Sequence, residues 1–252
     1  MNKWRWLWQK FVVFAIATFL IVFISGTVTF SQPPPLSNLP NPKVHSLPKS
    51  LEQWKDISEA DGNDYFDQID TTPLGYLIWS QFPVTVYVQQ PASFSNSATD
   101  KRYQKWIEAV KKAIAEWNIY LPLQETSERE EADIVVLRSQ PARKAKLNPS
   151  TGLYDIPRAV TAETTYKFYL QQDPQVIAHK MTVEISPSYA GTALLATIRH
   201  ELGHALGIWG HSKKETDALY FSQVSNPPDI SSGDINTLKK IYQQPTRLGW
   251  KL

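Results

Sequence analysis

Residues 200–211 read HELGHALGIWGH, and the rest of the fold has to be arranged around this stretch. On a helix, His200 and His204 are separated by four residues, so both imidazoles lie on one face and can bind the same metal ion. Neutral imidazole is a good ligand for Zn²⁺, with a nitrogen–metal distance of about 2.0–2.1 Å. The stretch therefore predicts a helix that supplies two ligands of a zinc site.

A third ligand has to come from beyond this helix. If the helix continued, His211 would lie about 10.5 Å further along the axis than His204 and could not reach the ion. Gly207 lies between them, and glycine is the residue that most readily adopts a positive φ and ends a helix. We therefore predict a sharp turn at Gly207 that brings His211 to the metal, with Gly210 allowing the chain to approach closely.

Glu201 is one step, roughly 100°, around the helix from His200. It is badly placed as a ligand of the same ion, but well placed beside a fourth position where water would bind. Three protein ligands and one open position are typical of catalytic zinc, which lowers the pKa of water to about 7 and polarises a carbonyl. Glu201 would then take the proton and pass it to the departing amine. The alternative, two histidines on an exposed helix, is disfavoured because the segment is apolar and unpaired buried imidazoles are costly.

At these residues the chain resembles a metzincin, and more narrowly a bacterial-style, matrixin-like zinc protease with an N-terminal membrane segment. The resemblance covers roughly residues 75–252 and includes Trp117, residues 132–134 and the pair His211-Ser212. It implies an α+β fold behind an N-terminal transmembrane helix. In that metzincin-like domain, a twisted mixed sheet and two long helices form the upper part, and one helix belongs to a small C-terminal part.

The resemblance also implies endopeptidase activity in a horizontal cleft. The substrate strand would pair against a sheet edge, which we expect at residues 176–185. Residues 221–229 would line the pocket for the side chain that follows the cleaved bond.

Three departures from the family pattern matter. Leu219 stands where the family's Met-turn carries methionine, and because leucine is apolar and similar in volume, a hydrophobic base beneath the zinc is still expected. Cysteine is absent, which excludes latency by a thiolate on zinc, disulfides and cysteine-ligated zinc. Residues 139–158 contain no histidine, which argues against a second, structural zinc, and His179 in a strand is more typical of a packed side chain. We therefore expect one catalytic Zn²⁺. A Ca²⁺ site is possible, but nothing in the sequence supports one.

Apolar periodicity elsewhere predicts the other elements of an α+β domain. Trp106, Val110, Ala113 and Trp117 recur at helical spacing and share one face. Ser231 and Asp234 resemble a capping box that opens the last helix. The predicted strands are residues 82–88, 133–137, 162–170 and 176–185, and the predicted helices are residues 99–117, 192–206 and 234–242.

The first 30 residues predict a membrane anchor. Residues 1–10 are basic and rich in Trp, which is typical of the cytoplasmic end of an anchor. Residues 11–30 contain no charge and are long enough to cross a hydrocarbon core of about 30 Å. A cleaved secretory signal is the alternative, although its apolar region is usually only about 7–15 residues long. Either interpretation places the rest of the chain outside the cytoplasm, anchored to the membrane or secreted.

Residues 31–50 contain six prolines and are predicted to form an extended, semi-rigid linker. His45 in this segment is expected to be solvated and without a role. The matrixin-like catalytic domain is predicted to span residues 51–252.

The 252 residues carry a formal net charge of +2 without a long run of like charge, so nothing indicates a nucleic-acid partner. We predict a zinc-dependent endopeptidase that hydrolyses peptide bonds of extracytoplasmic proteins. Its partners would be a protein or peptide substrate and the membrane, through residues 11–30; the oligomeric state is not indicated.

One alternative function is a non-catalytic zinc-binding module for adhesion or sensing, supported only by Leu219. Another replaces His211 by a downstream glutamate, for which Glu215 is the candidate but lies too near in sequence.

Overall fold

The computed structural model describes residues 39–55, 63–93, 95, 97–142, 146–147, 154–155, 161–222, 224 and 226–252. All of them belong to one compact unit, Ser37–Leu252. The predicted cytoplasmic segment (1–10), the predicted membrane helix (11–30) and the start of the predicted linker lie outside the described residues. Within the described part of the chain, no helix combines the length and the apolar character needed to cross a membrane.

Helices and strands follow one another in the order predicted for an α+β domain, and the predicted long helices are confirmed. The helical elements are α1 (Lys49–Gln53), the 3₁₀ turn η2 (Phe66–Gln68), α2 (Ala98–Trp117), α3 (Thr192–Ala205) and α4 (Ser232–Tyr242). The strands are β1 (Val84–Val88), β2 (Leu123–Thr126), β3 (Ile134–Leu137), β4 (Lys146–Leu147), β5 (Tyr154–Asp155), β6 (Ala162–Gln171) and β7 (Val176–Ile185).

The main sheet has the strand order β2-β1-β3-β7-β6. β1 pairs in parallel with β2 and β3, and β3 pairs in parallel with β7. β6 pairs antiparallel with β7 along its whole length, from Ala162↔Ile185 to Gln171↔Val176. The edge strand beside the site is therefore β6, and the prediction that residues 176–185 form the edge is wrong.

The position of β7 inside the sheet follows from its two partners. β7 pairs with β3 on one side and with β6 on the other, and its buried positions alternate along most of its length. Among the described residues β6 pairs with β7 alone, and its residues are mostly half-buried or exposed. Both segments show strand-like sequence patterns, and such a pattern does not reveal how many neighbours a strand has.

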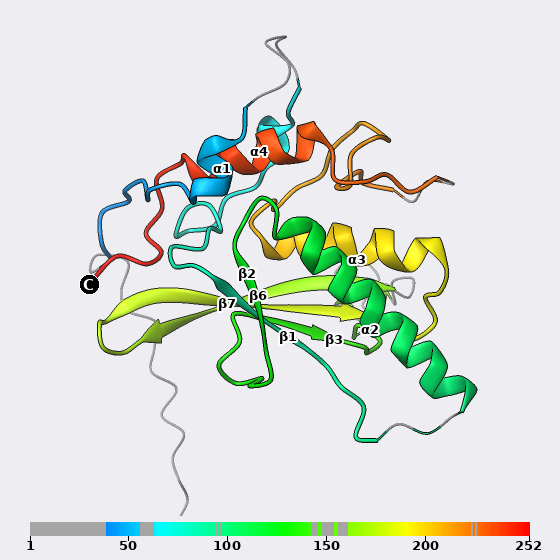
Figure 1. The fold of residues 1–252 in the computed structure, drawn as a ribbon. Coiled ribbons are helices and arrows are strands. Elements are labelled where there is room, and N and C mark those ends of the chain that lie inside the picture. Colours follow the sequence, from blue (N-terminus) through cyan, green and yellow to red (C-terminus); the bar gives the residue numbers. More distant parts are fainter. Residues whose placement is uncertain are drawn as a thin grey trace, which may run out of the picture. The chain divides into compact units, whose positions relative to one another are not determined.

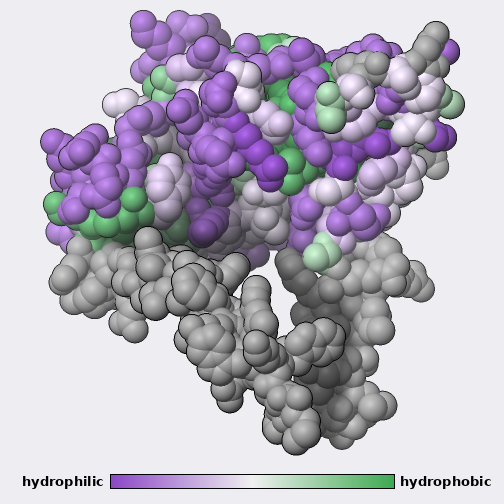
Figure 2. All heavy atoms as spheres, turned by 90° about the horizontal axis from the view of Figure 1, so that it is seen from below, coloured by the Kyte–Doolittle hydropathy of each residue, from purple (hydrophilic) through white to green (hydrophobic). Residues whose placement is uncertain are grey.

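Helices α2 and α3 lie side by side and cover the same face of the sheet (Figure 1). Trp106, Val110 and Trp117 form part of the buried face of α2, as predicted, and Val84 and Val86 of β1 are buried in the same core. On the face drawn in Figure 2, hydrophilic residues predominate among the described residues and apolar ones form small separate areas. Buried apolar side chains of α2, α3 and the main sheet belong to one core cluster.

The segment from residue 39 to α1 lies against the C-terminal end of the chain. Lys43 and Thr246 exchange two backbone hydrogen bonds, of 3.0 and 2.9 Å. His45 Nε2 donates to the carbonyl oxygen of Leu248 at 2.8 Å, and its ring stacks on Trp250 with the centroids 4.0 Å apart. The prediction of a solvated His45 without a role is therefore wrong. An extended proline-rich segment leaves backbone groups unpaired, and another extended segment can pair with them.

Candidate metal centre

The turn at Gly207 has the geometry that the sequence predicts. Helix α3 ends at Ala205, and Gly207 adopts a φ of 121°. The amide of Gly207 donates to the carbonyl oxygen of His204, and the amide of Ile208 donates to that of Gly203, both at 3.1 Å. This pair of bonds is a Schellman motif, which satisfies the last carbonyls of a helix. A Cβ on Gly207 would lie 2.4 Å from the carbonyl oxygen of Leu77, so the backbone leaves no room for a side chain.

The chain between Gly207 and His211 is one residue longer than the metzincin consensus, which has two residues between the glycine and the third histidine. The extra residue is accommodated by a tight turn, in which the Trp209 amide donates to the Gly207 carbonyl oxygen at 2.8 Å. Gly210 then pairs with Ile69, and a Cβ on Gly210 would lie 2.1 Å from the carbonyl oxygen of Gln68. Glycine at position 210 therefore allows the close approach that the sequence predicts.

This turn brings the three histidines together. The ligand nitrogens of His200, His204 and His211 lie within 4.8 Å of one another. Among the described residues, this is the one group of three or more histidine and acidic side chains with such a geometry. Glu215 is exposed and lies outside the group, and His179 is buried and stacks on Trp79 with the ring centroids 3.9 Å apart. The prediction that His179 is a packed side chain is confirmed.

Two backbone carbonyls fix the tautomers of His200 and His204. His200 Nδ1 lies 2.8 Å from the carbonyl oxygen of Ala218, and His204 Nδ1 lies 2.7 Å from that of Ile208. A carbonyl oxygen only accepts, so each Nδ1 carries a hydrogen and, in the neutral ring, each Nε2 carries a lone pair. Burial lowers the pKa of both histidines to about 4, with the His204 charge adding to the effect on His200, and burial also lowers the pKa of His211. The rings are therefore neutral near pH 7.

The donor set fits a zinc ion. The two Nε2 atoms of His200 and His204 are 3.1 Å apart, and neither can donate a hydrogen bond to the other when both Nδ1 atoms are protonated. A cation between them removes this repulsion. Two nitrogens bound tetrahedrally to one zinc would be about 3.3 Å apart, close to the separation in the structure. The carbonyls of Ala218 and Ile208 supply the second layer of hydrogen bonds that zinc-bound histidines usually have.

Glu201 lies between two cavities next to this cluster. The residue is only 8% exposed, and its carboxylate accepts a hydrogen bond of 2.6 Å from Thr164 Oγ1 on the edge strand β6. Burial raises the pKa of the Glu201 carboxyl, and the Thr164 hydrogen bond opposes that shift. Ala162, His200 and Glu201 line both cavities, so an extended ligand that occupies both would cross the cluster at this point.

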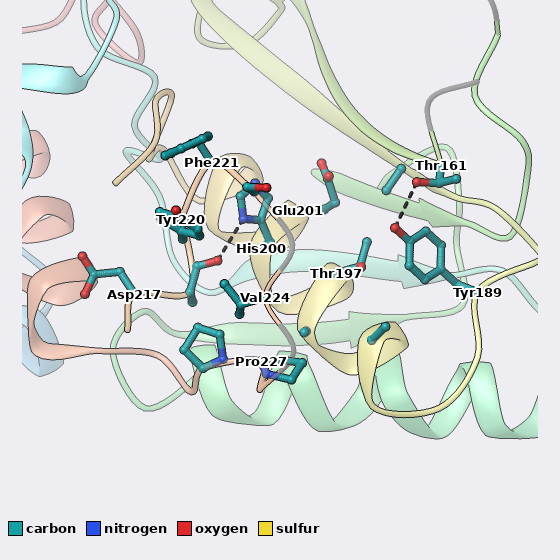
Figure 3. A pocket seen from close by; sticks show the side chains of 16 residues that line it. Thr161, Tyr189, Thr197, His200, Glu201, Asp217, Tyr220, Phe221, Val224 and Pro227 are labelled. Atoms are coloured by element: carbon teal, nitrogen blue, oxygen red, sulfur yellow. Dashed lines mark hydrogen bonds between the residues drawn. The ribbon is translucent and has the colours of Figure 1, made fainter. Parts of the chain in front are cut away.

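The two cavities differ in their walls. The first has a volume of about 240 Å³ and lies between α3 and the segment that follows Tyr220, as Figure 3 shows for Thr197, Val224 and Pro227. The prediction that the 221–229 segment lines a pocket is confirmed in part: Phe221, Ser222, Val224, Pro227 and Pro228 line this cavity, whereas Asn226 and Asp229 do not. The second has a volume of about 350 Å³ and opens towards His211, Trp209 and Asp70.

Leu219 is buried in the turn of residues 217–220, which supports the histidine cluster and is called the supporting turn. It is fully buried, and a Cβ on Gly203 would lie 2.5 Å from its Cδ2 atom, so Leu219 packs directly beneath α3. The predicted hydrophobic base is therefore present with leucine in place of methionine. Asp234 holds this turn by accepting from the amide of Ala218 at 2.8 Å and, more weakly, from that of Leu219 at 3.3 Å. The capping box of Ser231 and Asp234 is also confirmed.

The structure brings together all four residues that the sequence predicts for the site, and it adds others that the sequence did not reveal. Thr164 carries no local signal, because a threonine in a strand is common. For Asp234 the sequence pattern indicates only a role in capping α4. For Trp209 a signal exists, since it lies in the stretch whose extra residue lengthens the motif.

A family model described as Matrixin matches residues 89–243, which is more than half of the chain and includes the three histidines, Glu201 and the supporting turn. No curated protein matched the sequence. The chain belongs to the matrixin family of zinc metalloproteases.

Proposed function

We propose that this chain is a zinc endopeptidase in which His200, His204 and His211 hold a single catalytic ion and Glu201 is the general base. One observation carries the proposal: two imidazole nitrogens face each other at 3.1 Å with their tautomers fixed, beside a buried carboxylate that borders two cavities. Zinc bound there would polarise a peptide carbonyl and lower the pKa of water.

The chain's own residues would perform the remaining tasks. Glu201 would accept a proton from the attacking water on its carboxylate and pass it to the departing amine. Thr164 would keep that carboxylate oriented through its 2.6 Å hydrogen bond. Since β6 is the last strand of the sheet in the described part of the chain, an extended substrate would add to the sheet there, with the side chain after the cleaved bond in the 240 Å³ cavity.

For the N-terminal part we propose the arrangement that the sequence predicts. Residues 1–10 would lie in the cytoplasm and residues 11–30 would anchor the chain, unless they are cleaved as a signal. The catalytic domain would then act on extracytoplasmic proteins. Protease protection of the full chain in sealed inside-out membrane vesicles tests this orientation. The interior of such vesicles corresponds to the non-cytoplasmic side, so an extracytoplasmic domain should be digested only after the vesicles are opened.

Two variants test the catalytic assignment. Glu201→Gln keeps the size of the side chain but cannot accept a proton as the carboxylate does, so it should retain zinc and lose peptide cleavage by about 10²-fold or more. His204→Ala should lose the metal itself. A Glu201→Gln protein that cleaves a mixed peptide library as fast as the wild type would contradict the role of Glu201.

The same measurements decide between the two alternatives that the sequence left open. Stoichiometric zinc without any cleavage by the wild type would favour a non-catalytic binding module. A His211→Ala protein with full zinc affinity would favour a different third ligand.

A further inference from the structure

Arg199, the residue before His200, is a buried cation that contacts two separate parts of the molecule. Its side chain is only 4% exposed. On one side it forms a two-point ion pair with Glu116 near the end of α2, with Nε–Oε2 and Nη2–Oε1 distances of 2.7 and 3.0 Å. On the other side Nη1 donates to the carbonyl oxygen of Pro228 at 2.5 Å, and Nη2 lies 3.0 Å from a carboxylate oxygen of Asp229.

These contacts fasten the segment before α4 to the two long helices. The indole of Trp117 on α2 also donates to the carbonyl oxygen of Arg199, at 2.9 Å, so the backbone of α3 is held at the same point. Arg199 is thus a junction between α2, α3 and the segment of Pro227, Pro228 and Asp229. We call this set of contacts the Arg199 junction.

The fastened segment is a wall of the 240 Å³ cavity. Pro227 and Pro228 line it from this segment, and Ala196 and Thr197 line it from α3. Figure 3 shows Pro227 and Thr197 on these two walls. Arg199 is on α3 but does not line the cavity, and its guanidinium holds the other wall through the carbonyl oxygen of Pro228. The distance between the two walls therefore depends on this side chain.

Packing of α2 against α3 alone would not need a cation at this position. A buried charge requires partners, and an apolar side chain of similar size could fill the same space between two helices. The guanidinium, with its five fork-shaped donors, can hold Glu116 and a backbone carbonyl at the same time. Asp229 contributes less to this junction than Glu116 and Pro228 do, because its side chain is 94% exposed and solvent screens its ion pair with Arg199.

We infer that Arg199 is a positioning residue that fixes the width of this cavity and so determines which side chains are accepted after the cleaved bond. The inference rests on the proposed function and extends it to substrate selection. Because the cavity walls are mainly small or apolar residues, the side chains it selects are apolar ones, discriminated by size.

The main test compares the double variant Arg199→Met/Glu116→Gln with the wild-type full chain. Removing both charges avoids an unpaired buried ion, so the fold has the best prospect of being retained. Cleavage is measured on four peptides that differ only in having Ala, Leu, Phe or Trp after the scissile bond. We expect the ratio of the highest to the lowest kcat/KM among the four peptides to fall at least fivefold, mainly through changes in KM. The zinc content should not change.

Three single variants control this result. Glu116→Gln keeps the bonds to Pro228 and Asp229 and should leave the selectivity within about twofold of the wild type. Arg199→Lys keeps the charge, but an ammonium group lacks the planar fork that binds Glu116 and Pro228 at the same time. Its selectivity should therefore lie between those of the wild type and the double variant. Asp229→Asn, at an exposed position, should narrow the spread only slightly and remains measurable if the double variant does not fold.

Hydrogen exchange gives a readout that does not depend on cleavage. Backbone amides of residues 229–232 should exchange faster in the Arg199 variants than in Glu116→Gln, while those of α3 should not change. An Arg199 variant that folds, binds zinc and keeps both the wild-type selectivity and the wild-type exchange would overturn the inference. If the zinc-loaded wild type cleaves none of the peptides, the proposed function fails, and the exchange data still decide whether Arg199 holds the segment.

Discussion

Two turns support the histidine cluster, and they are built in different ways. The turn of residues 207–211 is determined by backbone crowding, since a side chain at Gly207 or Gly210 would collide with a carbonyl oxygen of another segment. The turn of residues 217–220 is held by side chains: Asp234 accepts from its amides, and Leu219 packs beneath Gly203. Where backbone meets backbone, only glycine fits. Where side chains meet, another residue of similar shape can take the place, as leucine does for methionine.

The largest expected effect comes from Gly207→Ala. The new methyl group would meet the Leu77 carbonyl oxygen at 2.4 Å at a φ of 121°, so the turn must open and His211 must move. We expect the free energy of unfolding to fall by about 3 kcal/mol or more and zinc binding to be lost. Urea unfolding and metal analysis of the purified protein measure both.

Gly191→Ala is the matched control for this prediction. Gly191 also has a positive φ, of 68°, but a Cβ there would meet no atom within 4 Å. The free energy of unfolding should fall only by the backbone strain, about 1–2 kcal/mol, and zinc should bind as in the wild type. Equal effects of the two substitutions would show that the crowding at Leu77 is not what shapes the turn.

A smaller effect is expected from Asp234→Asn, which weakens the turn of residues 217–220 while keeping the size of the side chain at position 234. An amide group would place a donor opposite the amides of Ala218 and Ser231, which now donate to the carboxylate. We expect a loss of about 2 kcal/mol in unfolding free energy. Because Ala218 also accepts from His200, zinc affinity in a competitive chelator titration should fall about tenfold. Unchanged zinc affinity would mean that the turn does not need Asp234 to hold His200.

Thr164→Val should act on the carboxylate of Glu201 and leave both turns intact. Valine keeps the shape of threonine but removes the donor to Glu201. We expect kcat to fall about tenfold, equivalent to about 1.4 kcal/mol, with KM and zinc content unchanged. Thr164→Ser, which keeps the hydroxyl, should retain most of the wild-type kcat. If serine and valine were equally impaired, the hydroxyl would not be the group that matters.

The smallest effect is expected from Leu219→Met, which restores the residue that the family carries. The two side chains have similar volumes, so the unfolding free energy should change by less than about 1.5 kcal/mol and kcat/KM by less than about threefold. A rise in activity of tenfold or more would show that the methionine sulfur contributes something that the apolar volume of Leu219 does not.

The site was more predictable from the sequence than its surroundings. His200, His204 and Glu201 are separated by one to four residues on one helix, and helix geometry alone brings them together. Gly207 signals its own turn, because positive φ is a property of the residue itself. The sequence predicts the wrong edge strand, because residues 162–170 and 176–185 both show strand-like patterns and such patterns do not reveal how many neighbours a strand has.

What the sequence by itself determined is the set of metal ligands, the bend that gathers them and the apolar faces of the helices. These features depend on neighbours within about a dozen residues, where backbone geometry fixes distance and direction. Tertiary structure alone decided that Thr164 reaches Glu201, that Arg199 joins Glu116 to Pro228, and that the segment around His45 lies on Leu248 and Trp250. Those partners are 29 to 205 residues apart, and their contact depends on the path of the whole chain, which no local pattern encodes.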